Sequence, residues 1–351
     1  MQSLKEISDI FKQYGEDMEK STKIYSFLAI HVADDPELID LVFKNNKNKQ
    51  LPPLILFGPV HYLLLKGIKH PLRDFYPTIV GDKAKDMIGN YNIFHDFCLA
   101  HSKEIIELMQ TKIVQTNEVN RSTVLFTGFN WIIDEQHKSE LSLIELGCSA
   151  GLNLCWDKFC YQFEDKLVGN GGCELILSCE VRGPFRPNFD FTSIRIKDRV
   201  GIDLNPLNIS SEEDSLWLQS LIWPERLERL INLQKAIKIS KNYPKKLIKG
   251  HGSSKLGEVL NIIDKETVVV VYQSFAFYLF SDKEKEKIKN ILLDSSRLRP
   301  IYLLSMEWEG INGKRTFLKV DSFINGKQES FTLAESHFHG EWIKWLINSK
   351  N

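Results

Sequence analysis

The chain has 351 residues, of which 43% are hydrophobic and 26% are charged, as in an ordinary globular protein. Its 45 Lys and Arg against 46 Asp and Glu give a formal net charge of -1. A balance so close to neutral gives no support to a polyanionic partner, so we expect no nucleic-acid binding. The length exceeds that of one typical hydrophobic core and predicts one large or two moderate domains.

The beginning of the sequence lacks the apolar segment and cleavage site of a secretory signal, which favours a cytoplasmic protein. The longest apolar stretch, residues 51–65, is interrupted by prolines and a glycine. It is also shorter than the roughly 20 residues that a membrane-spanning helix needs. We therefore expect no membrane partner.

Residues 1–125 predict a helical N-terminal domain of five or six helices. Apolar residues recur at helical spacing in the segments 4–14, 24–32 and 36–43, and later in 54–65 and 94–108. The segment 54–65 is interrupted at Gly58-Pro59, which predicts a break in that helix. Strand patterns are nearly absent from this part of the chain.

Residues 126–351 predict a second domain, in which short apolar strands alternate with helical segments. The expected strands are 141–146, 174–181, 199–203, 247–248, 267–272 and 301–306, followed by an antiparallel pair, 316–323 and 329–333, that turns at Asn325-Gly326. The expected helices are 153–159, 283–293, 341–347 and one that begins with a capping box of Ser210 and Glu213. The alternation indicates an α/β domain with a Rossmann-like, mostly parallel sheet.

Five of the six cysteines lie between Cys148 and Cys179. Cys155 and Cys160 have the spacing of a zinc-binding pair, but the next pair, Cys173 and Cys179, is spaced too widely for a typical second pair. We favour small buried thiols in a reducing compartment, with structural zinc as the alternative.

The stretch "ELGCSAGLN" places a loop with two glycines directly after the first predicted strand. Glycines there permit positive φ and a close approach of a ligand to the main chain. The dinucleotide fingerprint G-x-G-x-x-G is excluded because Ser149 and Leu152 stand at its second and third glycine positions, and no phosphate-binding P-loop is present. The pattern instead resembles the first motif of S-adenosylmethionine-dependent methyltransferases. The cofactor-binding residues expected in this motif are Glu145, Gly147, Ser149, Gly151 and Asn153.

A second acidic residue is needed to bind the ribose hydroxyls of such a cofactor. Asp203 ends the strand of "RVGIDLNP" and is favoured for this role. Glu164 and Asp165 are nearer to the usual spacing of roughly 20 residues beyond the loop, but they belong to what reads as an exposed turn. Choosing Asp203 implies that residues 161–195 are an inserted segment.

Four stretches together resemble a bacterial family known as domain of unknown function 2332: "ELGCSAGLNLCWDKFCYQF", "GIDLNPLNISSEEDSLWLQSLIWPERLERL", "VQTNEVNR" and "ESHFHGEWIKWL". The resemblance spans nearly the whole chain and implies a methyltransferase-like fold and an S-adenosylmethionine-like ligand, but no substrate. Family members often carry Gly-Asp where this chain has Gly250-His251, and an aliphatic residue or alanine where it has Cys148.

The methyl acceptor is expected near the end of the fourth predicted strand, where Gln273 and Ser274 stand. The Asp/Asn-Pro-Pro-aromatic signature of DNA and amide methyltransferases is missing there. Gln273 and Ser274 are therefore candidates to orient an acceptor, or simply a helix cap. In His337-x-His339, His339 is a candidate general base; two metal ligands are the alternative, but no third ligand is evident in the sequence.

Four further residues are candidates for substrate binding. Glu307 stands at the end of the fifth predicted strand, and Asn117, Glu118 and Arg121 form a polar run before the second domain. The alternative readings are a surface carboxylate and a linker between helices. The sequence thus favours an S-adenosylmethionine-dependent methyltransferase acting on a small molecule or a protein. A protein that binds the cofactor or a nucleoside without transferring methyl is the second hypothesis, and an interaction protein with a degenerate site is the third.

Overall fold

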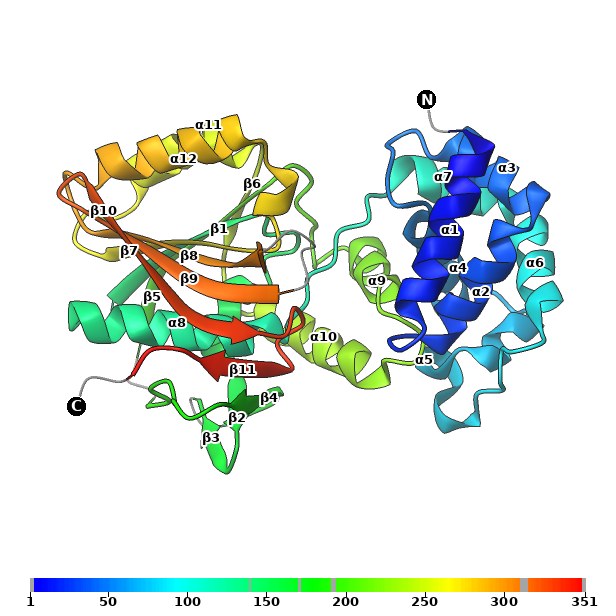
Figure 1. Ribbon diagram of the computed structural model, residues 1–351, viewed down its shortest axis with the longest axis horizontal. Coiled ribbons are helices and arrows are strands. Elements are labelled where there is room, and N and C mark those ends of the chain that lie inside the picture. The colour runs from blue at the N-terminus through cyan, green and yellow to red at the C-terminus, as the bar shows by residue number, and fades with distance from the viewer. Residues whose placement is uncertain (1–2, 139, 170–171, 191–193, 310–314, 349–351) are drawn as a thin grey trace. The chain divides into compact units, whose positions relative to one another are not determined.

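A computed structural model describes residues 3–138, 140–169, 172–190, 194–309 and 315–348 (Figure 1). The chain forms two compact units, Met1–Thr116 with Ser210–Ile231, and Asn117–Ile209 with Asn232–Asn351. The expected boundary at residue 125 lies inside α8 (Arg121–Gln136), which belongs to the second unit. A segment that follows the first strands of the second unit returns to the first unit as α9 (Glu212–Ser220).

The described part of the first unit is helical. It contains α1 (Leu4–Met18), α2 (Lys23–Ala33), α3 (Pro36–Asn45), α4 (Pro52–Leu65), η1 (Pro71–Phe75), α5 (Pro77–Val80), η2 (Gly81–Lys83), α6 (Tyr91–Ala100), α7 (Ser102–Thr111) and α9. The expected break at Gly58-Pro59 is wrong, because α4 continues through Pro59. Nearly all of α4 is buried among α1, α7 and α9, and packing of this kind outweighs the local cost of a proline. The segment 94–108 forms two helices rather than one.

The second unit is built around one sheet. Its strands are β1 (Glu140–Leu146), β2 (Cys160–Phe163), β3 (Lys166–Val168), β4 (Ile176–Arg182), β5 (Arg195–Asp203), β6 (Lys246–Lys249), β7 (Val268–Ser274), β8 (Ile301–Glu309), β9 (Arg315–Ile324), β10 (Lys327–Ser336) and β11 (Trp342–Trp345). Its helices are α8, η3 (Asn153–Lys158), α11 (Gly252–Ile262), η4 (Phe277–Leu279) and α12 (Asp282–Ser295), while α10 (Leu227–Ser240) crosses the boundary between the two units.

The strand order is β3-β2-β4-β11-β10-β9-β8-β7-β1-β5-β6. The run β8-β7-β1-β5-β6 is parallel throughout, and Ile144 of β1 pairs with Val200 of β5 and Val271 of β7. Strands β8 to β11 are joined by antiparallel pairing, and β4 and β2 extend the sheet beyond β11. The protein therefore has the expected α/β fold with a Rossmann-like, mostly parallel sheet.

Helices cover both faces of this sheet (Figure 1). On one face, α11 and α12 pack over a core that includes Ile144, Val200 and Val271. On the other face, α8 contacts β4, β8 and β9, because the sheet curls around it. Gly128 of α8 permits this approach, since a Cβ there would lie 2.5 Å from Cδ1 of Leu304. The parallel strands are thus buried on both sides, as their continuous apolar sequences predict.

Several local predictions are wrong. The segment 341–347 forms strand β11 instead of a helix, because Ile343 and Trp345 alternate with exposed Lys344 and the strand is paired on both sides. The helix expected at 153–159 is present as the 3-10 helix η3 (Asn153–Lys158) rather than as an α-helix, and Ser211 rather than Ser210 caps α9. Helices α8, α10 and α11 were not expected as separate elements.

The inserted segment 161–195 carries β2, β3 and β4; within it, Asn170, Gly171 and residues 191–193 lie outside the described residues. Cys160 and Cys173 form a disulfide, so the expectation that these two are free thiols is wrong. The main-chain N–H of Cys160 donates to the oxygen of Leu175, and this contact helps to bring the two cysteines together. Cys98, Cys148, Cys155 and Cys179 are free and buried.

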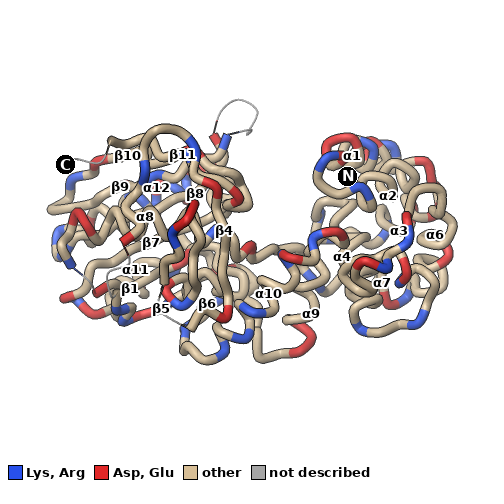
Figure 2. The backbone as a smooth tube through the Cα atoms, turned by 90° about the horizontal axis from the view of Figure 1, so that it is seen from below, with Lys and Arg blue, Asp and Glu red and all other residues tan. Residues whose placement is uncertain are grey.

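Basic and acidic residues are interspersed along the chain in both units (Figure 2). This distribution accompanies the near-neutral net charge. Within the described ranges, no helix has both the length and the apolar character needed to cross a bilayer.

Candidate functional site

The candidate site lies where the order of the parallel strands reverses. From β1 the chain continues to β5 and β6 on one side, and later to β7 and β8 on the other. Ligands of open α/β sheets bind outside the carboxyl ends of the strands at such a point. The loop after β1 and the loop after β7 lie in contact there, since a Cβ on Gly147 would be 2.5 Å from Cβ of Ala276.

The loop between β1 and η3 has an unusual backbone. Gly147, Ser149 and Gly151 have φ values of 71°, 50° and 64°, so the expected need for positive φ is present at both glycines. The space beside these glycines, however, is occupied by the protein itself. A Cβ on Gly151 would lie 2.9 Å from Cδ2 of Leu247. Close packing of neighbouring loops and strands is by itself sufficient to require the two glycines.

Asp203 connects the end of β5 to this loop. Its Oδ2 accepts a hydrogen bond of 2.8 Å from the N–H of Ser149, and its Oδ1 accepts one of 2.8 Å from the N–H of Asn205. A carboxylate offers about four lone-pair positions, so these two bonds leave acceptor capacity on both oxygens. Glu164 lies instead in the turn between β2 and β3, where it forms an ion pair with Arg186. Asp165 lies in the same turn.

Glu145 lies beneath the loop rather than on its surface. Its side chain is 2% exposed, and the hydroxyl of Tyr272 donates to its Oε2 at 3.2 Å. Burial raises the pKa of Glu145 well above its usual value, and the neighbouring Asp203 adds to this shift. The carboxyl group of Glu145 is therefore enclosed by the protein at the end of β1, directly before the loop.

The 3-10 helix η3, which follows the loop, is fixed by polar contacts. The buried carboxylate of Asp157 accepts two hydrogen bonds from Arg199 of β5, of 2.6 and 2.7 Å. Oδ1 of Asn153 accepts a hydrogen bond of 2.8 Å from the hydroxyl of Ser122 on α8. The end of the glycine loop is thereby held on both the sheet and α8.

Asn117 and Glu118 also lie against the loop. Oδ1 of Asn117 accepts a 3.0 Å hydrogen bond from the N–H of Leu152, and the main-chain oxygen of Glu118 accepts one of 3.4 Å from Asn153. Both side chains are buried. The structure thus brings this polar segment together with the expected cofactor loop. The two hydrogen bonds join the segment to the loop and to η3.

Gln273 and Ser274 end β7. Gln273 is fully buried, and its Oε1 accepts hydrogen bonds from the N–H groups of Ala276 at 2.9 Å and Phe277 at 3.3 Å. This is the capping role that the sequence left open. Nε2 of Gln273 is buried without a hydrogen-bond partner among the described residues, and an unsatisfied buried donor calls for an explanation.

Arg121 joins the end of β7 to the turn between β10 and β11. Its Nη1 donates to the main-chain oxygen of Ser274 at 3.3 Å, and its Nε donates to the oxygen of Phe338 at 3.1 Å. The guanidinium lies 4.4 Å from the centre of the Phe275 ring. Through these contacts Arg121 positions two segments that carry candidate residues.

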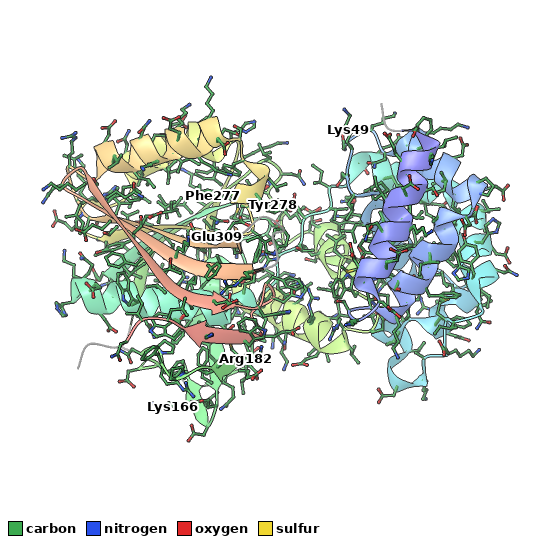
Figure 3. The ribbon with its side chains drawn as sticks, viewed as in Figure 1. Lys49, Lys166, Arg182, Phe277, Tyr278 and Glu309 are labelled. Atoms are coloured by element: carbon green, nitrogen blue, oxygen red, sulfur yellow. A yellow bond between two sulfur atoms is a disulfide. The ribbon has the colours of Figure 1, made fainter. Side chains whose placement is uncertain are left out.

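Glu307 lies at the end of the adjacent strand β8. Its carboxylate accepts hydrogen bonds from the N–H groups of Trp308 at 3.0 Å and Tyr278 at 3.2 Å. Burial raises its pKa. Figure 3 shows Phe277 and Tyr278 on the loop after β7, with Glu309 at the end of β8. Glu307 therefore holds the aromatic loop beside the site.

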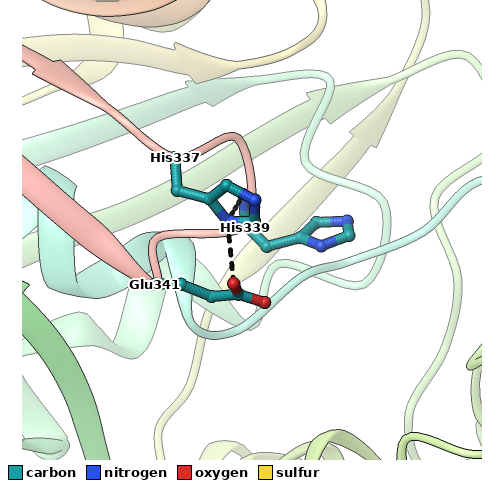
Figure 4. Close-up of side chains that lie close together, drawn as sticks. All are labelled: His337, His339 and Glu341. Carbon is teal, nitrogen blue, oxygen red and sulfur yellow. Dashed lines mark hydrogen bonds and ion pairs between the residues drawn. The ribbon is translucent and has the colours of Figure 1, made fainter. Parts of the chain in front are cut away.

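His339 lies on the turn between β10 and β11, close to His337 and Glu341 (Figure 4). The sequence showed the two histidines but not Glu341 as a third group. Lys245 is a second residue that the sequence did not indicate. A Cβ on Gly151 would lie 3.3 Å from Cδ of Lys245, whose pKa is lowered by burial. Because Lys245 precedes the short strand β6 in a basic stretch, only the fold reveals its position beside the loop.

A separate hollow of about 470 Å³ lies in the first unit. It is open and is lined in part by Asp35, Glu37, Tyr91 and His95. The hydroxyl of Tyr91 donates to Asp35 at 2.6 Å, and Nε2 of His95 lies 3.1 Å from Glu37. These polar groups therefore bond to one another, which accounts for them without a ligand.

The comparisons with known proteins identify the family of the chain. No curated protein matches the sequence. Among solved structures, one of an S-adenosylmethionine-dependent methyltransferase from Clostridium acetobutylicum ATCC 824 is similar at 11% sequence identity and a TM-score of 0.24. The match covers 68% of this chain and 78% of that one. Residues 8–345 match the model of a family described as uncharacterized proteins conserved in bacteria, DUF2332, and the chain belongs to this family.

Proposed function

We propose that the loop between β1 and η3 binds S-adenosylmethionine and that the protein transfers the methyl group to a small-molecule or protein acceptor. One observation carries the proposal: Asp203 contacts this loop at the point where the strand order reverses. The remaining lone pairs of Asp203 suit two vicinal ribose hydroxyls. The loop also lacks the glycine spacing of a dinucleotide site, which argues against NAD.

The residues around the loop fit such a ligand in two respects. Asp203 is an acceptor for hydroxyl groups, and Nε2 of Gln273 is a buried donor without a partner among the described residues. The cofactor supplies an electrophilic methyl group. The protein's part is then to hold an acceptor in line with that group, and positioning of this kind can supply much of a rate enhancement. Gln273 and Ser274 are the residues proposed to orient the acceptor. Glu307 and Arg121 shape the acceptor side of the site. His339 is the proposed proton acceptor.

The test is calorimetry of the purified protein with S-adenosylmethionine, S-adenosylhomocysteine, NAD and ATP. The two sulfur compounds should bind, and NAD and ATP should bind much more weakly. Asp203→Asn should weaken cofactor binding about tenfold or more, because a charge-assisted hydrogen bond contributes roughly 1.5 to 3 kcal/mol. Its melting temperature should fall as well, since Asp203 also holds Ser149 and Asn205.

Asp165→Asn is the matched control, because Asp165 lies in the turn between β2 and β3. It should leave both the affinity and the melting temperature unchanged. A folded Asp203→Asn protein with the affinity of the wild type would limit Asp203 to supporting the loop. Binding of NAD without any response to either sulfur compound would exclude the proposed cofactor.

A second candidate function is binding of the cofactor or of a nucleoside without methyl transfer. The contacts of Gln273 favour it, because its amide oxygen already accepts two main-chain hydrogen bonds and cannot readily turn toward an acceptor. The two candidates differ in the fate of the methyl group. With S-adenosylmethionine labelled in the methyl group, adding the protein to a bacterial extract should label an acceptor above the level of the extract alone only if the protein is an enzyme, and Asp203→Asn should then reduce this added transfer.

A further inference from the structure

The turn between β10 and β11 brings together three potential metal ligands. His337, His339 and Glu341 each present one nitrogen or oxygen atom, and these atoms lie within 4.8 Å of one another. Figure 4 shows the His337 ring beside the Glu341 carboxylate, joined to it by a dashed line, with the His339 side chain next to them. His337 and His339 are partly buried, and Glu341 is exposed. Solvent and an ion can therefore reach the group.

The spacing of the atoms is close to that of a coordination sphere. Nδ1 of His337 lies 3.5 Å from Oε2 of Glu341. Two ligands of a tetrahedral Zn²⁺ at the usual bond lengths are separated by about 3.4 Å. Nδ1 of His337 also accepts a long hydrogen bond of 3.4 Å from the main-chain N–H of His339, and an ion bound to Nδ1 would replace this hydrogen bond.

The backbone of the turn is fixed, which lowers the entropic cost of collecting the three ligands. The N–H of His337 donates to the oxygen of Trp342 at 2.9 Å, and the N–H of Gly340 donates to the oxygen of His337 at 2.9 Å. Asn120, which directly precedes α8, and Thr123 of α8 each donate a side-chain hydrogen bond of 2.9 Å to the oxygen of Gly340.

Gly340 is required for this arrangement. Its φ is 77°, and a Cβ there would lie 2.3 Å from the main-chain oxygen of Asn120. Arg121, the next residue of α8, holds the oxygen of Phe338 between the two histidines. The turn is thus attached to the N-terminal end of α8, and through Arg121 to the end of β7. An ion bound there would lie near the proposed acceptor side.

We propose that His337, His339 and Glu341 bind one divalent transition-metal ion, with Zn²⁺ as the ion of choice. Two neutral imidazoles and one carboxylate suit Zn²⁺ and leave a coordination position for water or a substrate oxygen or nitrogen. Hard cations such as Mg²⁺ and Ca²⁺ prefer oxygen ligands and are disfavoured. The proposal goes beyond methyl transfer and does not depend on it. With the ion bound, His339 is a ligand and is no longer available as a general base.

The experiment uses the full chain after removal of metal with a chelator. Co²⁺ serves as a spectroscopic probe, and Zn²⁺ is measured by competition with a chromophoric chelator. We expect one ion per chain, with visible Co²⁺ absorption that Zn²⁺ abolishes. Zn²⁺ should also raise the melting temperature, because a ligand that binds only the folded state stabilises it. His339→Asn and Glu341→Gln should each weaken binding about tenfold or more and remove the thermal shift.

His251 and Glu284 provide a matched control. Nδ1 of His251 lies 3.3 Å from Oε1 of Glu284, so this pair has the same type of contact, but no third ligand accompanies it among the described residues. His251→Asn should leave Zn²⁺ binding unchanged. The proposal is overturned if the wild-type chain takes up no Zn²⁺ at micromolar concentration, or if His339→Asn and Glu341→Gln fold normally and keep the wild-type affinity. Equal losses in the His251→Asn protein would likewise contradict it, because they would show non-specific binding.

Discussion

The side-chain carboxyl group of Glu145 is buried, where water cannot solvate its charge. Desolvation raises its pKa well above the usual 4.5, and the single hydrogen bond from Tyr272 opposes this shift only in part. Glu145 therefore binds its proton more tightly in the folded protein than in the unfolded chain. The contribution of Glu145 to stability is fully present below its unfolded pKa, and it is lost as the pH rises from there toward the folded pKa.

Glu145→Gln is expected to remove this pH dependence. Glutamine keeps an acceptor oxygen for the Tyr272 hydroxyl but cannot ionise. The difference in the free energy of unfolding between variant and wild type should therefore shift in favour of the variant as the pH is raised from 5 to 8. Urea unfolding over that pH range measures it. A constant difference would show that Glu145 does not titrate above its ordinary range in the folded protein.

Single residues differ in how far the sequence revealed their roles. The position of Asp203 beside the glycine loop could be predicted because a strand-ending acid is visible in the pattern "GIDLNP". The sequence could not decide between function and capping for Gln273, since both roles use the same polar side chain after a buried strand. Glu341 was missed because the segment 341–347 was interpreted as a helix, whereas it leads into β11.

Among the elements, the β2–β3 hairpin is held by a covalent bond as well as by pairing. Cys160 is the first residue of β2, and Cys173 follows β3 with a sequence separation of 13. Strand β3 lies at the outer edge of the sheet and, among the described residues, pairs with β2 alone. Strand β2 is buried and pairs with β4, whereas β3 is largely exposed, so the cross-link restrains the outer part of a hairpin that packing leaves weakly held.

Reduction of this disulfide should loosen the hairpin. For a closed loop of this size, the chain-entropy model predicts a loss of about 3 kcal/mol. Dithiothreitol should accelerate amide hydrogen exchange at Cys160 and through β2, while exchange in β1 and β7 stays unchanged. In the double variant Cys160→Ser, Cys173→Ser, exchange should already be fast and should not respond to the reagent. A wild-type hairpin that is indifferent to reduction would show that packing alone holds it.

In the molecule as a whole, His61 joins helices from distant parts of the sequence. It lies fully buried in α4; its Nδ1 contacts the main-chain oxygen of Ser220 in α9, and its Nε2 contacts the hydroxyl of Thr78 in α5. Burial lowers its pKa from 6.5 to about 4. In the unfolded chain His61 therefore binds a proton as the pH falls below 6.5, whereas in the folded first unit it binds one only near pH 4.

The first unit should therefore lose stability in mild acid. The contribution of His61 is fully present above pH 6.5 and declines as the pH falls toward 4, by about 3 kcal/mol in total. His61→Gln, which cannot take up this proton, should show a flatter decline over that range. His31→Gln, at an exposed position of the same unit, should follow the wild type. Urea unfolding at a series of pH values, followed by signals from the first unit, tests both variants.

The sequence by itself determined the elements whose pattern is local. The apolar run before Gly147, the run "TVVVVY" and the Asn325-Gly326 turn specify two central strands and a hairpin, because alternation, continuous apolarity and turn chemistry act between near neighbours. The α/β class followed from their alternation with helices. The acid of Asp203 could likewise be placed beside the glycine loop, since parallel neighbouring strands present their carboxyl ends at one edge.

Only the tertiary structure decided the features that depend on contacts between distant segments. The sequence near 341–347 suits a helix or a strand, and pairing with β10 and β4 makes it β11. The Cys160–Cys173 bond, the return of α9 to the first unit and the meeting of Glu341 with two histidines arise in the same way. Burial and strand pairing between distant segments supply the free energy that decides among these alternatives. Such contacts outweigh local propensity, and they cannot be recognised in the local sequence pattern.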